Sequence, residues 1–393
     1  MDVERFRKSP AGRVVRASQG GTAYWAFVPN PLPPKLEFDS RLVSTLSDAD
    51  RSLGELAGLG RTMPNPHLLI GPFVRREAVL SSRIEGTQAD VTDLYAYEAR
   101  QLFLPGPSRP EPESDVREVA NYVRALEYGL GRLNTLPVSL RLMRELHERL
   151  MHGVRGERAT PGDFRRSQNW VGPPGCTLEA ATFIPPAPIE LRQGLDALEK
   201  YLHSENESPP LVRIALIHYQ FEALHPFLDG NGRIGRLLIS LLLVHWNLLP
   251  LPLLYLSAYF ERNRQGYYDL LQAVSERGAW REWLIFFLRG VADQARDANL
   301  RAKRLQDLQA DFRSRLTQGR ASTLPLSLAD SLFELPMLTI PLAQKKLKVT
   351  YASARRNVEK LVTAGILQQV GESSYGKTFV AQEILRVIGE AEE

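Results

Sequence analysis

Residues 225–236 read HPFLDGNGRIGR and join two helical patterns, residues 211–224 and residues 233–246. Gly230 and Gly232 favour a tight turn between them, because a residue without Cβ accepts conformations and close approaches that other residues do not. Backbone N–H groups in such a turn, together with those at the start of the following helix, attract an anion. The stretch therefore predicts a helix, an anion-binding turn and a second helix.

Five polar side chains in this stretch fit the transfer of a phosphate group. Arg233 and Arg236 are three residues apart, so both lie on one helix face beside the anion site. Asn231 adds a neutral donor, and Asp229 can hold the divalent cation that anionic phosphates need. His225 has an ordinary pKa suited to proton abstraction near neutral pH. Together they supply a base, a metal carboxylate and two cationic clamps.

Other interpretations of the glycines and histidines are weaker. The spacing of Gly230, Gly232 and Gly235 matches a dinucleotide-binding fingerprint, but that motif needs a preceding strand, and residues 211–224 have a helical pattern. A plain helical corner with a core histidine leaves the aligned arginines unexplained. Elsewhere, the two histidines of HERLMH, residues 147–152, are five apart and not four, so they do not form a zinc-binding pair on one helix face.

The stretch closely resembles the signature of the Fic family, HPFx(D/E)GNGRxxR, and fills every position of it. The resemblance implies a protein adenylyltransferase that moves AMP from ATP onto a Tyr, Thr or Ser hydroxyl of a target protein, and onto itself. His225 would take the proton of that hydroxyl, and Asp229 would hold Mg²⁺ between the α- and β-phosphates. The nucleotide-binding residues implied by the resemblance are Asp229, Gly230, Asn231, Gly232, Arg233, Arg236 and Asn263.

Three further segments resemble parts of the same family. Residues 161–165 (PGDFR) are similar to its PGxFR motif. Residues 182–186 (TFIPP) are similar to its flap, which would register the target segment by backbone pairing. Residues 257–268 (SAYFERNRQGYY) are similar to the nucleoside-pocket segment, in which Asn263 would face the adenine or ribose. The expected flap residues are Thr182, Phe183 and Ile184.

Residues 81–86 (SSRIEG) resemble the inhibitory motif of the family, (S/T)xxxE(G/N). Ser81 and Glu85 are four residues apart, which places them on one helix face, and Gly86 is a natural C-cap. The resemblance implies that Glu85 reaches Arg236 and occupies the place of the γ-phosphate, so that ATP binds only in an unproductive pose. In some relatives the same glutamate supports removal of AMP, which leaves the reverse reaction open.

The fold class expected from the whole chain is mostly α. We expect an N-terminal region with the inhibitory helix over residues 1–110, a helical core with a short hairpin flap over 111–300, and a linker helix with a winged helix-turn-helix over 301–393. Residues 1–37 read as an arm or short strands, and residues 101–114 as a loop. Apolar and charged helices are expected over 281–294 and 297–316.

The last seventy or so residues favour a winged helix, because three helical patterns precede two strand patterns around the turn GESSYG. Basic residues of the third pattern are Arg355, Arg356 and Lys360, which makes DNA a candidate partner. Acidic residues, including Glu359 and the tail residues Glu390, Glu392 and Glu393, dilute this charge. Whether the unit binds DNA or protein, or only packs on the core, is open at this level.

Composition and charge set the remaining expectations. With 393 residues, 44% hydrophobic and 24% charged, the chain has an ordinary globular composition. The net charge of +4 permits a polyanionic partner without demanding one. The single cysteine, Cys176, excludes an internal disulfide and a Cys-rich zinc site and is typical of a reducing compartment. Without an apolar N-terminal stretch, the sequence predicts no signal peptide and a cytoplasmic location.

Residues 237–256 lack Asp, Glu, Lys and Arg and are long enough to cross a membrane. Pro250 and Pro252 break the helix after about Leu249, so a buried core helix is the interpretation. No membrane contact is expected, and a homodimer is one candidate oligomeric state.

Two kinds of function remain open beside AMP transfer. One is transfer of another nucleotide, such as UMP, or net removal of AMP. The other is a DNA-binding regulator in which the core senses a nucleotide. The intact His225 and Asp229 favour an enzyme, because a sensor needs neither a base nor a metal carboxylate.

Overall fold

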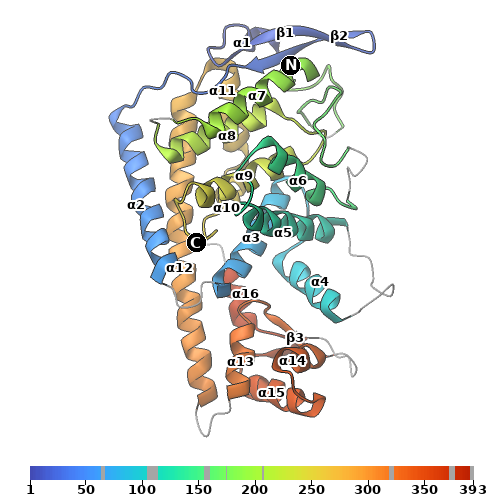
Figure 1. The fold of residues 1–393 in the computed structure, drawn as a ribbon, viewed down its shortest axis with the longest axis vertical. Helices are drawn as coiled ribbons and strands as arrows, with labels where there is room; N and C mark the ends of the chain where they lie inside the picture. The colour runs from blue at the N-terminus through green and yellow to red at the C-terminus, as the bar shows by residue number, and fades with distance from the viewer. Residues whose placement is uncertain are drawn as a thin grey trace.

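The computed structural model describes residues 1–62, 67–103, 114–154, 160–173, 175–205, 208–317, 323–370 and 377–389. Helices dominate the fold, which confirms the expected class, and they stack along one long axis (Figure 1). A two-stranded hairpin lies across one end of the molecule, and the C-terminal helices form the other end. The long helix α12 (Trp280–Thr317) runs along the side and joins the two ends.

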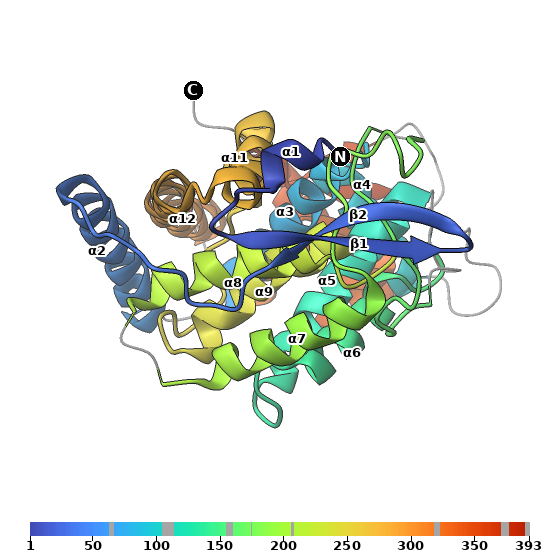
Figure 2. The same cartoon turned by 90° about the horizontal axis from the view of Figure 1, so that it is seen from above.

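The N-terminal arm is a short helix followed by an antiparallel hairpin, so the expectation of short strands is confirmed. Helix α1 (Val3–Phe6) precedes strands β1 (Gly12–Gln19) and β2 (Thr22–Pro29). Gly20 and Gly21 form the turn with φ of +58° and +84°, values that glycine adopts without steric cost. Seen from above, the hairpin lies across the helical core (Figure 2).

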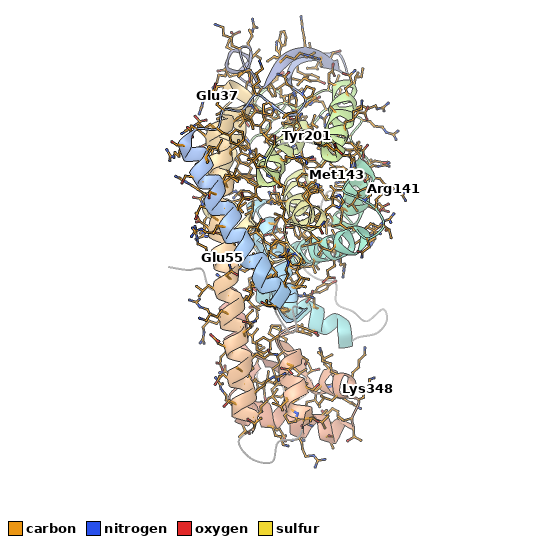
Figure 3. The ribbon with its side chains drawn as sticks, turned by 60° about the vertical axis from the view of Figure 1, so that its left-hand side comes forward. Glu37, Glu55, Arg141, Met143, Tyr201 and Lys348 are labelled. Carbon is orange, nitrogen blue, oxygen red and sulfur yellow. The ribbon has the colours of Figure 1, made fainter. Side chains whose placement is uncertain are left out.

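The helices that follow the arm build the core. Their bounds are α2 (Ser40–Thr62), α3 (His67–Ile84), α4 (Val91–Phe103), α5 (Ser114–Arg132), α6 (Leu140–Leu150), α7 (Pro188–His203), α8 (Pro210–Leu224), α9 (Asn231–His245), α10 (Ser257–Arg262) and α11 (Arg264–Arg277). Helix α2 packs along α12 (Figure 3). Helix α3 ends just before Gly86, whose φ of +102° fits the expected C-cap.

Two central helices, α8 and α9, are apolar on almost every face because other helices surround them. Residues 237–243 of α9 are all buried, as the interpretation of a core helix requires. The helix ends at His245, four residues earlier than expected, and Asn247 turns the chain with φ of +57°. Within the described residues, no helix combines the length and the apolar character needed to cross a membrane.

Helix α12 is one continuous element of 38 residues, although two adjacent helices were expected. Residues 295–296, between the two patterns, contain neither glycine nor proline, so nothing ends the helix there. Its first half is buried in the core, where Trp283 donates a hydrogen bond from Nε1 to the carbonyl oxygen of Ala215 at 3.0 Å. The proposed domain division at residue 300 falls inside this helix and stays a prediction, as does the division at residue 110.

The C-terminal unit contains the expected three helices, a three-stranded sheet and a last helix. Its elements are α13 (Thr323–Ser331), β3 (Met337–Thr339), α14 (Ile340–Leu347), α15 (Tyr351–Thr363), β4 (Gln368–Val370), β5 (Thr378–Val380) and α16 (Gln382–Gly389). The antiparallel strand order is β3-β5-β4. Strand β3 and helix α16 were not expected.

Local signals explain where α14 and α15 begin. Thr339 and Thr350 cap the two helices, each accepting a hydrogen bond from the backbone N–H three residues on. Lys348 ends α14 in the left-handed region, with φ of +54° (Figure 3). The expected turn GESSYG, residues 371–376, the acidic tail and most of the expected loop 101–114 lie outside the described residues. Residues 101–103 belong to α4, so that loop begins later than expected.

Core packing around α12 gives a stability prediction. Trp283→Ala will lower the free energy of unfolding by about 3–5 kcal/mol, because it empties a fully buried aromatic site. Leu300→Ala, on the same helix but 37% exposed, will cost about 0.5 kcal/mol or less. Urea denaturation of both variants checks this. Equal losses would contradict the described packing of Trp283.

Candidate active site

The connection between α8 and α9 is a strained loop at the centre of the core. His225 ends α8 with φ of +46° and ψ of +61°, a left-handed conformation that is uncommon for a residue with a Cβ. Gly230, with φ of +76°, precedes α9, and a Cβ there would lie 2.9 Å from the sulfur of Met151. Such strain persists only where surrounding contacts impose it.

Hydrogen bonds from distant segments impose that shape. Arg165 donates from Nε to the carbonyl oxygen of His225 at 2.9 Å, and Asn169 donates from Nδ2 to that of Phe227 at 2.7 Å. The amide of Asn231 both accepts from the N–H and donates to the carbonyl of Phe227, each at 2.8 Å. The sequence suggested Asn231 as a donor to the ligand, whereas here its amide braces the loop.

His147 is a second brace that sequence reasoning did not identify. Its ring stacks on that of Phe227, with centroids 3.8 Å apart. Nδ1 accepts a hydrogen bond from the N–H of Gly162 at 2.9 Å, so Nε2 carries the proton and donates to the carbonyl of Asp229 at 3.1 Å. Burial lowers the pKa of His147 to about 4, which keeps the ring neutral in this role.

His225 is arranged as a proton acceptor. Its Nδ1 lies 3.2 Å from the carbonyl oxygen of Glu222, which can only accept, so Nδ1 carries the proton and Nε2 has the free lone pair. Burial is the main cause that lowers the pKa of His225, to about 4. The imidazole is therefore in its basic form at neutral pH.

The start of α9 is open to an anion. The first hydrogen bond within the helix runs from the N–H of Ile234 to the carbonyl of Gly230 at 3.1 Å, and no side chain caps the helix. The N–H groups of Asn231, Gly232 and Arg233 precede it. These groups and the helix dipole favour a negatively charged ligand at the loop.

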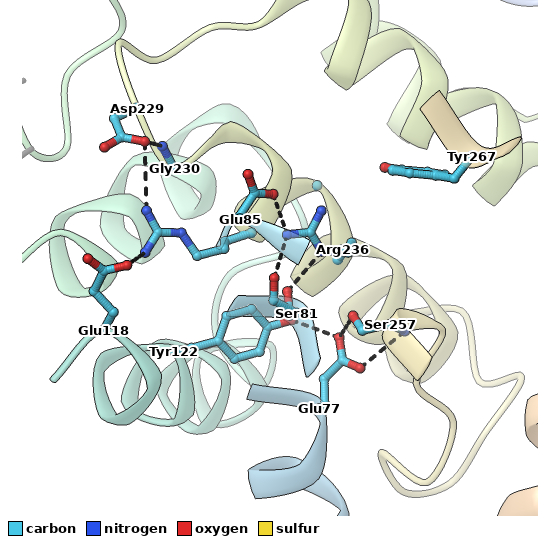
Figure 4. A network of polar contacts seen from close by, with 12 residues as sticks. Glu77, Ser81, Glu85, Glu118, Tyr122, Asp229, Gly230, Arg236, Ser257 and Tyr267 are labelled. Carbon is cyan, nitrogen blue, oxygen red and sulfur yellow. Dashed lines mark hydrogen bonds and ion pairs between the residues drawn. The ribbon is translucent and has the colours of Figure 1, made fainter. Parts of the chain in front are cut away.

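Arg233 is buried beside this helix start and is already paired. Its Nη1 lies 2.9 Å from Oε2 of Glu118, and its Nη2 lies 3.7 Å from Oδ1 of Asp229 (Figure 4). The side chain of Asp229 is 50% exposed and accepts a hydrogen bond from the N–H of Gly230 at 2.6 Å. Glu118, which the sequence did not single out, thus neutralises the first motif arginine.

Arg236 receives the contact expected from the inhibitory segment. It donates to Oγ and to the carbonyl oxygen of Ser81, both at 2.9 Å, and to Oε1 of Glu85 at 2.6 Å (Figure 4). Burial opposes ionisation of Glu85, but the charge of Arg236 outweighs it and holds the Glu85 pKa below its ordinary value. Gly232 makes room, because a Cβ there would lie 2.3 Å from Oε1 of Glu85.

The buried carboxyl group of Glu77 holds α3 in place near the ion pair between Arg236 and Glu85. Glu77 accepts hydrogen bonds from Oγ of Ser257 at 2.6 Å and from the hydroxyl of Tyr122 at 3.0 Å. Burial raises the Glu77 pKa to about 7, so near neutral pH the carboxyl group is protonated in part of the protein molecules. These bonds tie the helix that carries Ser81 and Glu85 to α10 and α5.

The expected nucleoside segment flanks the site without a hydrogen bond to the motif. Asn263 lies exposed at the junction of α10 and α11 and donates from Nδ2 to the carbonyl of Tyr259 at 2.9 Å. Tyr267 is buried, with its hydroxyl 2.8 Å from Nε2 of His218. Tyr268 is 37% exposed. The role of Asn263 toward a nucleotide stays a prediction.

The expected flap pairs with the chain on both sides. Phe183 exchanges backbone hydrogen bonds with Val171, and the N–H of Thr182 donates to the same carbonyl. The carbonyl of Ile184 accepts from the N–H of Phe27 on the N-terminal hairpin at 2.8 Å. The hairpin therefore occupies part of one flap edge, a contact that the sequence did not predict.

A dedicated metal cage is not part of the described structure. Among the residues that it covers, no three His, Cys, Asp or Glu side chains gather as a metal-binding group. Mg²⁺ bound together with phosphates needs only one or two carboxylates. The half-exposed carboxylate of Asp229, beside the open start of α9, fits that requirement.

This geometry defines a helical protein whose chemistry is centred on one loop between its two central helices. Two family models match adjacent parts of the chain: the Fic/DOC family N-terminal model covers residues 43–131, and the Fic/DOC family model covers residues 137–243. Residues 43–131 and 137–243 of this chain therefore belong to the Fic/DOC family.

Similar proteins agree with this assignment. The chain is 33% identical to Protein adenylyltransferase Fic of Drosophila erecta over 162 residues, 40% of this chain and 29% of that protein. It is 32% identical to the protein of the same name from Drosophila melanogaster over 162 residues, with 40% and 30% covered. The matches thus span less than a third of these relatives. A Fic family protein from Desulfovibrio desulfuricans G20 shares the fold, with a TM-score of 0.55, 18% identity, and 92% and 100% of the two chains covered.

The buried pair of Arg233 and Glu118 gives a second stability prediction. Glu118→Ala will lower the free energy of unfolding by about 3–5 kcal/mol, because it leaves a buried guanidinium without its closest counter-charge. As the control, Arg355→Ala removes an exposed ion pair with Glu359 and will change the free energy of unfolding by about 1 kcal/mol or less. Denaturant titration measures both, and a loss for Glu118→Ala no larger than the control's would refute the structural role of this pair.

Proposed function

We propose that this protein transfers AMP from ATP to a hydroxyl side chain of a target protein. The observation that carries the proposal is the loop at residues 225–230, where a neutral imidazole with a free Nε2 lies beside the uncapped start of α9. The two named relatives are protein adenylyltransferases, and the Fic/DOC family model matches residues 137–243, which contain the loop. Both observations support the same chemistry.

In the proposed reaction, Nε2 of His225 accepts the proton of the target hydroxyl as its oxygen attacks the α-phosphorus of ATP. A new P–O bond forms, the bond to the β-phosphate oxygen breaks, and pyrophosphate leaves with the electron pair. The N–H groups at the start of α9 and the guanidinium of Arg233 stabilise the negative charge on the phosphoryl oxygens. Mg²⁺, held by Asp229 and the phosphates, would supply further charge neutralisation.

We infer that the target segment binds along the flap and presents a Tyr, Thr or Ser hydroxyl to His225. The pairing of Ile184 with Phe27 leaves only part of the flap edge for such a segment. This chain's own hydroxyl residues are candidate targets as well. Asn263 and Tyr268, both exposed, are the proposed nucleoside contacts, and the hydroxyl of Tyr268 feels the charge of Arg236 on the motif helix.

Glu85 is the proposed brake. Its carboxylate binds Arg236 in the place proposed for the γ-phosphate, and Gly232 provides the room for either group. Since the pKa of Glu85 lies below its ordinary value, the ion pair persists above that pKa and weakens only as the pH falls through it. A change of pH around neutrality therefore does not release the brake; a competing ligand or a movement of α3 must do so.

Other proposals from the sequence keep their status as alternatives. Transfer of a different nucleotide or removal of AMP would use the same loop. For the C-terminal unit, the DNA proposal depends on three exposed cations of α15, Arg355, Arg356 and Lys360, the first of which pairs with Glu359 at 2.8 Å. A winged-helix role, a homodimer and a cytoplasmic location likewise stay proposals.

The first test is self-labelling from α-labelled ATP with Mg²⁺. Glu85→Gly will raise the label by roughly tenfold to a hundredfold, the effect of removing a competing charged hydrogen bond. His225→Ala, combined with Glu85→Gly, will lower it by roughly 10²- to 10⁴-fold, because general base catalysis is lost. Incorporated label is counted after denaturing gel electrophoresis.

Arg83→Ala is the matched control, since Arg83 is exposed in the last turn of α3, two residues before Glu85. It should leave labelling at the wild-type level. Equal labelling of wild type and Glu85→Gly would refute the brake. Label that persists after loss of His225 would refute the proposed mechanism.

A further inference from the structure

A second carboxyl lies one helical turn from Glu85 on the same face of α9. A Cβ at Gly232 would lie 2.3 Å from Oε1 of Glu85, and a Cβ at Gly235 would lie 2.2 Å from Oε1 of Glu222. The two glycines are three residues apart and therefore share a face of the helix. Because glycine has no side chain, each position leaves room for one carboxyl group. Glu85, directly after α3, lies at Gly232, and Glu222, in the last turn of α8, lies at Gly235.

The two carboxyl groups differ in what they bind. Glu85 is held by Arg236 at 2.6 Å. Glu222 makes no side-chain hydrogen bond or ion pair within the described residues, and its Oε1 is buried without a partner. Buried polar atoms are nearly always hydrogen-bonded, and a functional role is one explanation for an atom that is not. This carboxyl is therefore placed to receive a group from outside the chain.

The surroundings of Glu222 favour its uncharged form. Titratable groups from four parts of the chain face Glu222. They are His218 on α8, His225 directly after α8, Arg236 on α9, Glu85 directly after α3, and Tyr267 and Tyr268 on α11. Burial raises its pKa to about 8; Arg236 opposes this rise and Glu85 adds to it. At neutral pH most molecules thus carry a protonated Glu222, which can donate a hydrogen bond.

The carboxyl group of Glu222 lies close to the proposed nucleotide site. Glu222 lies beside Arg236, which is the proposed partner of the outer phosphate once Glu85 leaves. Figure 4 shows Tyr267 with its hydroxyl end turned toward Arg236. We propose that Glu222 is a nucleotide-contacting residue whose carboxyl O–H donates a hydrogen bond to an outer phosphate oxygen of ATP. This inference rests on the proposed function and adds a contact to it.

The proposal has a consequence for pH. An ionised Glu222 would lose its hydrogen and place a negative charge beside the triphosphate, so nucleotide affinity must fall as the pH rises above the pKa of the free site. Linkage sets the slope at roughly tenfold per pH unit while the bound form stays protonated. Glutamine at this position cannot ionise and keeps N–H donors, so it should remove the pH dependence and retain binding.

The experiment measures binding of α,β-methylene-ATP with Mg²⁺ by calorimetry, in the full chain carrying Glu85→Gly. Between pH 7.5 and pH 9 the dissociation constant is expected to rise by about tenfold. With Glu222→Gln added, it should change by less than twofold over the same range. With Glu222→Ala added, affinity at pH 7 should fall by about tenfold or more, which corresponds to one lost hydrogen bond to a charged group.

AMP and melting temperatures provide the controls. AMP lacks the outer phosphates, so its affinity should be the same in the Glu85→Gly chain with and without Glu222→Ala. An equal loss for AMP would overturn the contact with an outer phosphate. A pH profile that Glu222→Gln leaves unchanged, in variants that melt together, would overturn the inference alone. If the Glu85→Gly chain binds neither nucleotide at any pH, the proposed function fails as well.

Discussion

The site depends on the charge of Arg236, a guanidinium buried in the middle of a helical core. A buried cation is costly unless counter-charge and hydrogen bonds surround it. Ser81 and Glu85 of α3 provide both, and Gly232 leaves the space in which the carboxylate fits. The same requirement can be met by a phosphate, so under the proposed function the carboxylate and the nucleotide compete for one cation. The proposed inhibition by Glu85 then follows from how the buried charge is neutralised.

The strength of that internal contact depends on what holds α3 in place. Glu77, one helical turn before Ser81, binds Ser257 of α10 and Tyr122 of α5. These bonds fix the depth of the helix relative to α9. Any signal that releases Glu85 must therefore move a segment anchored at two other helices, or must offer Arg236 a stronger anion. The low pKa of Glu85 leaves little room for protonation as the trigger.

The loop that carries His225 illustrates a related point about strain. Its left-handed residue would be unfavourable alone, but Arg165 and Asn169 bind the carbonyls that this conformation exposes. His147 supports the opposite end by bonding the carbonyl of Asp229. His225 and Asp229, the proposed base and metal carboxylate, are thus positioned by residues that touch the backbone of the loop. The positioning residues are therefore as necessary to the geometry as the motif itself.

The sequence by itself determined the helix-turn-helix arrangement of residues 225–236 and which polar side chains it carries. Glycine turns, helix starts and the three-residue spacing of the arginines are local properties, so they can be inferred without tertiary contacts. The Ser81–Glu85 pair was predicted because a helix fixes its shared face, although its partner came from family resemblance.

Only the tertiary structure decided which distant residues neutralise and brace that site. Glu118, Glu77 and the seat of Glu222 on Gly235 carry no local signal, since a charged residue on an amphipathic helix is usually solvated. The same is true of the pairing between the N-terminal hairpin and the flap. The physical reason is that burial, and with it the need for a partner, arises when segments far apart in the chain pack together.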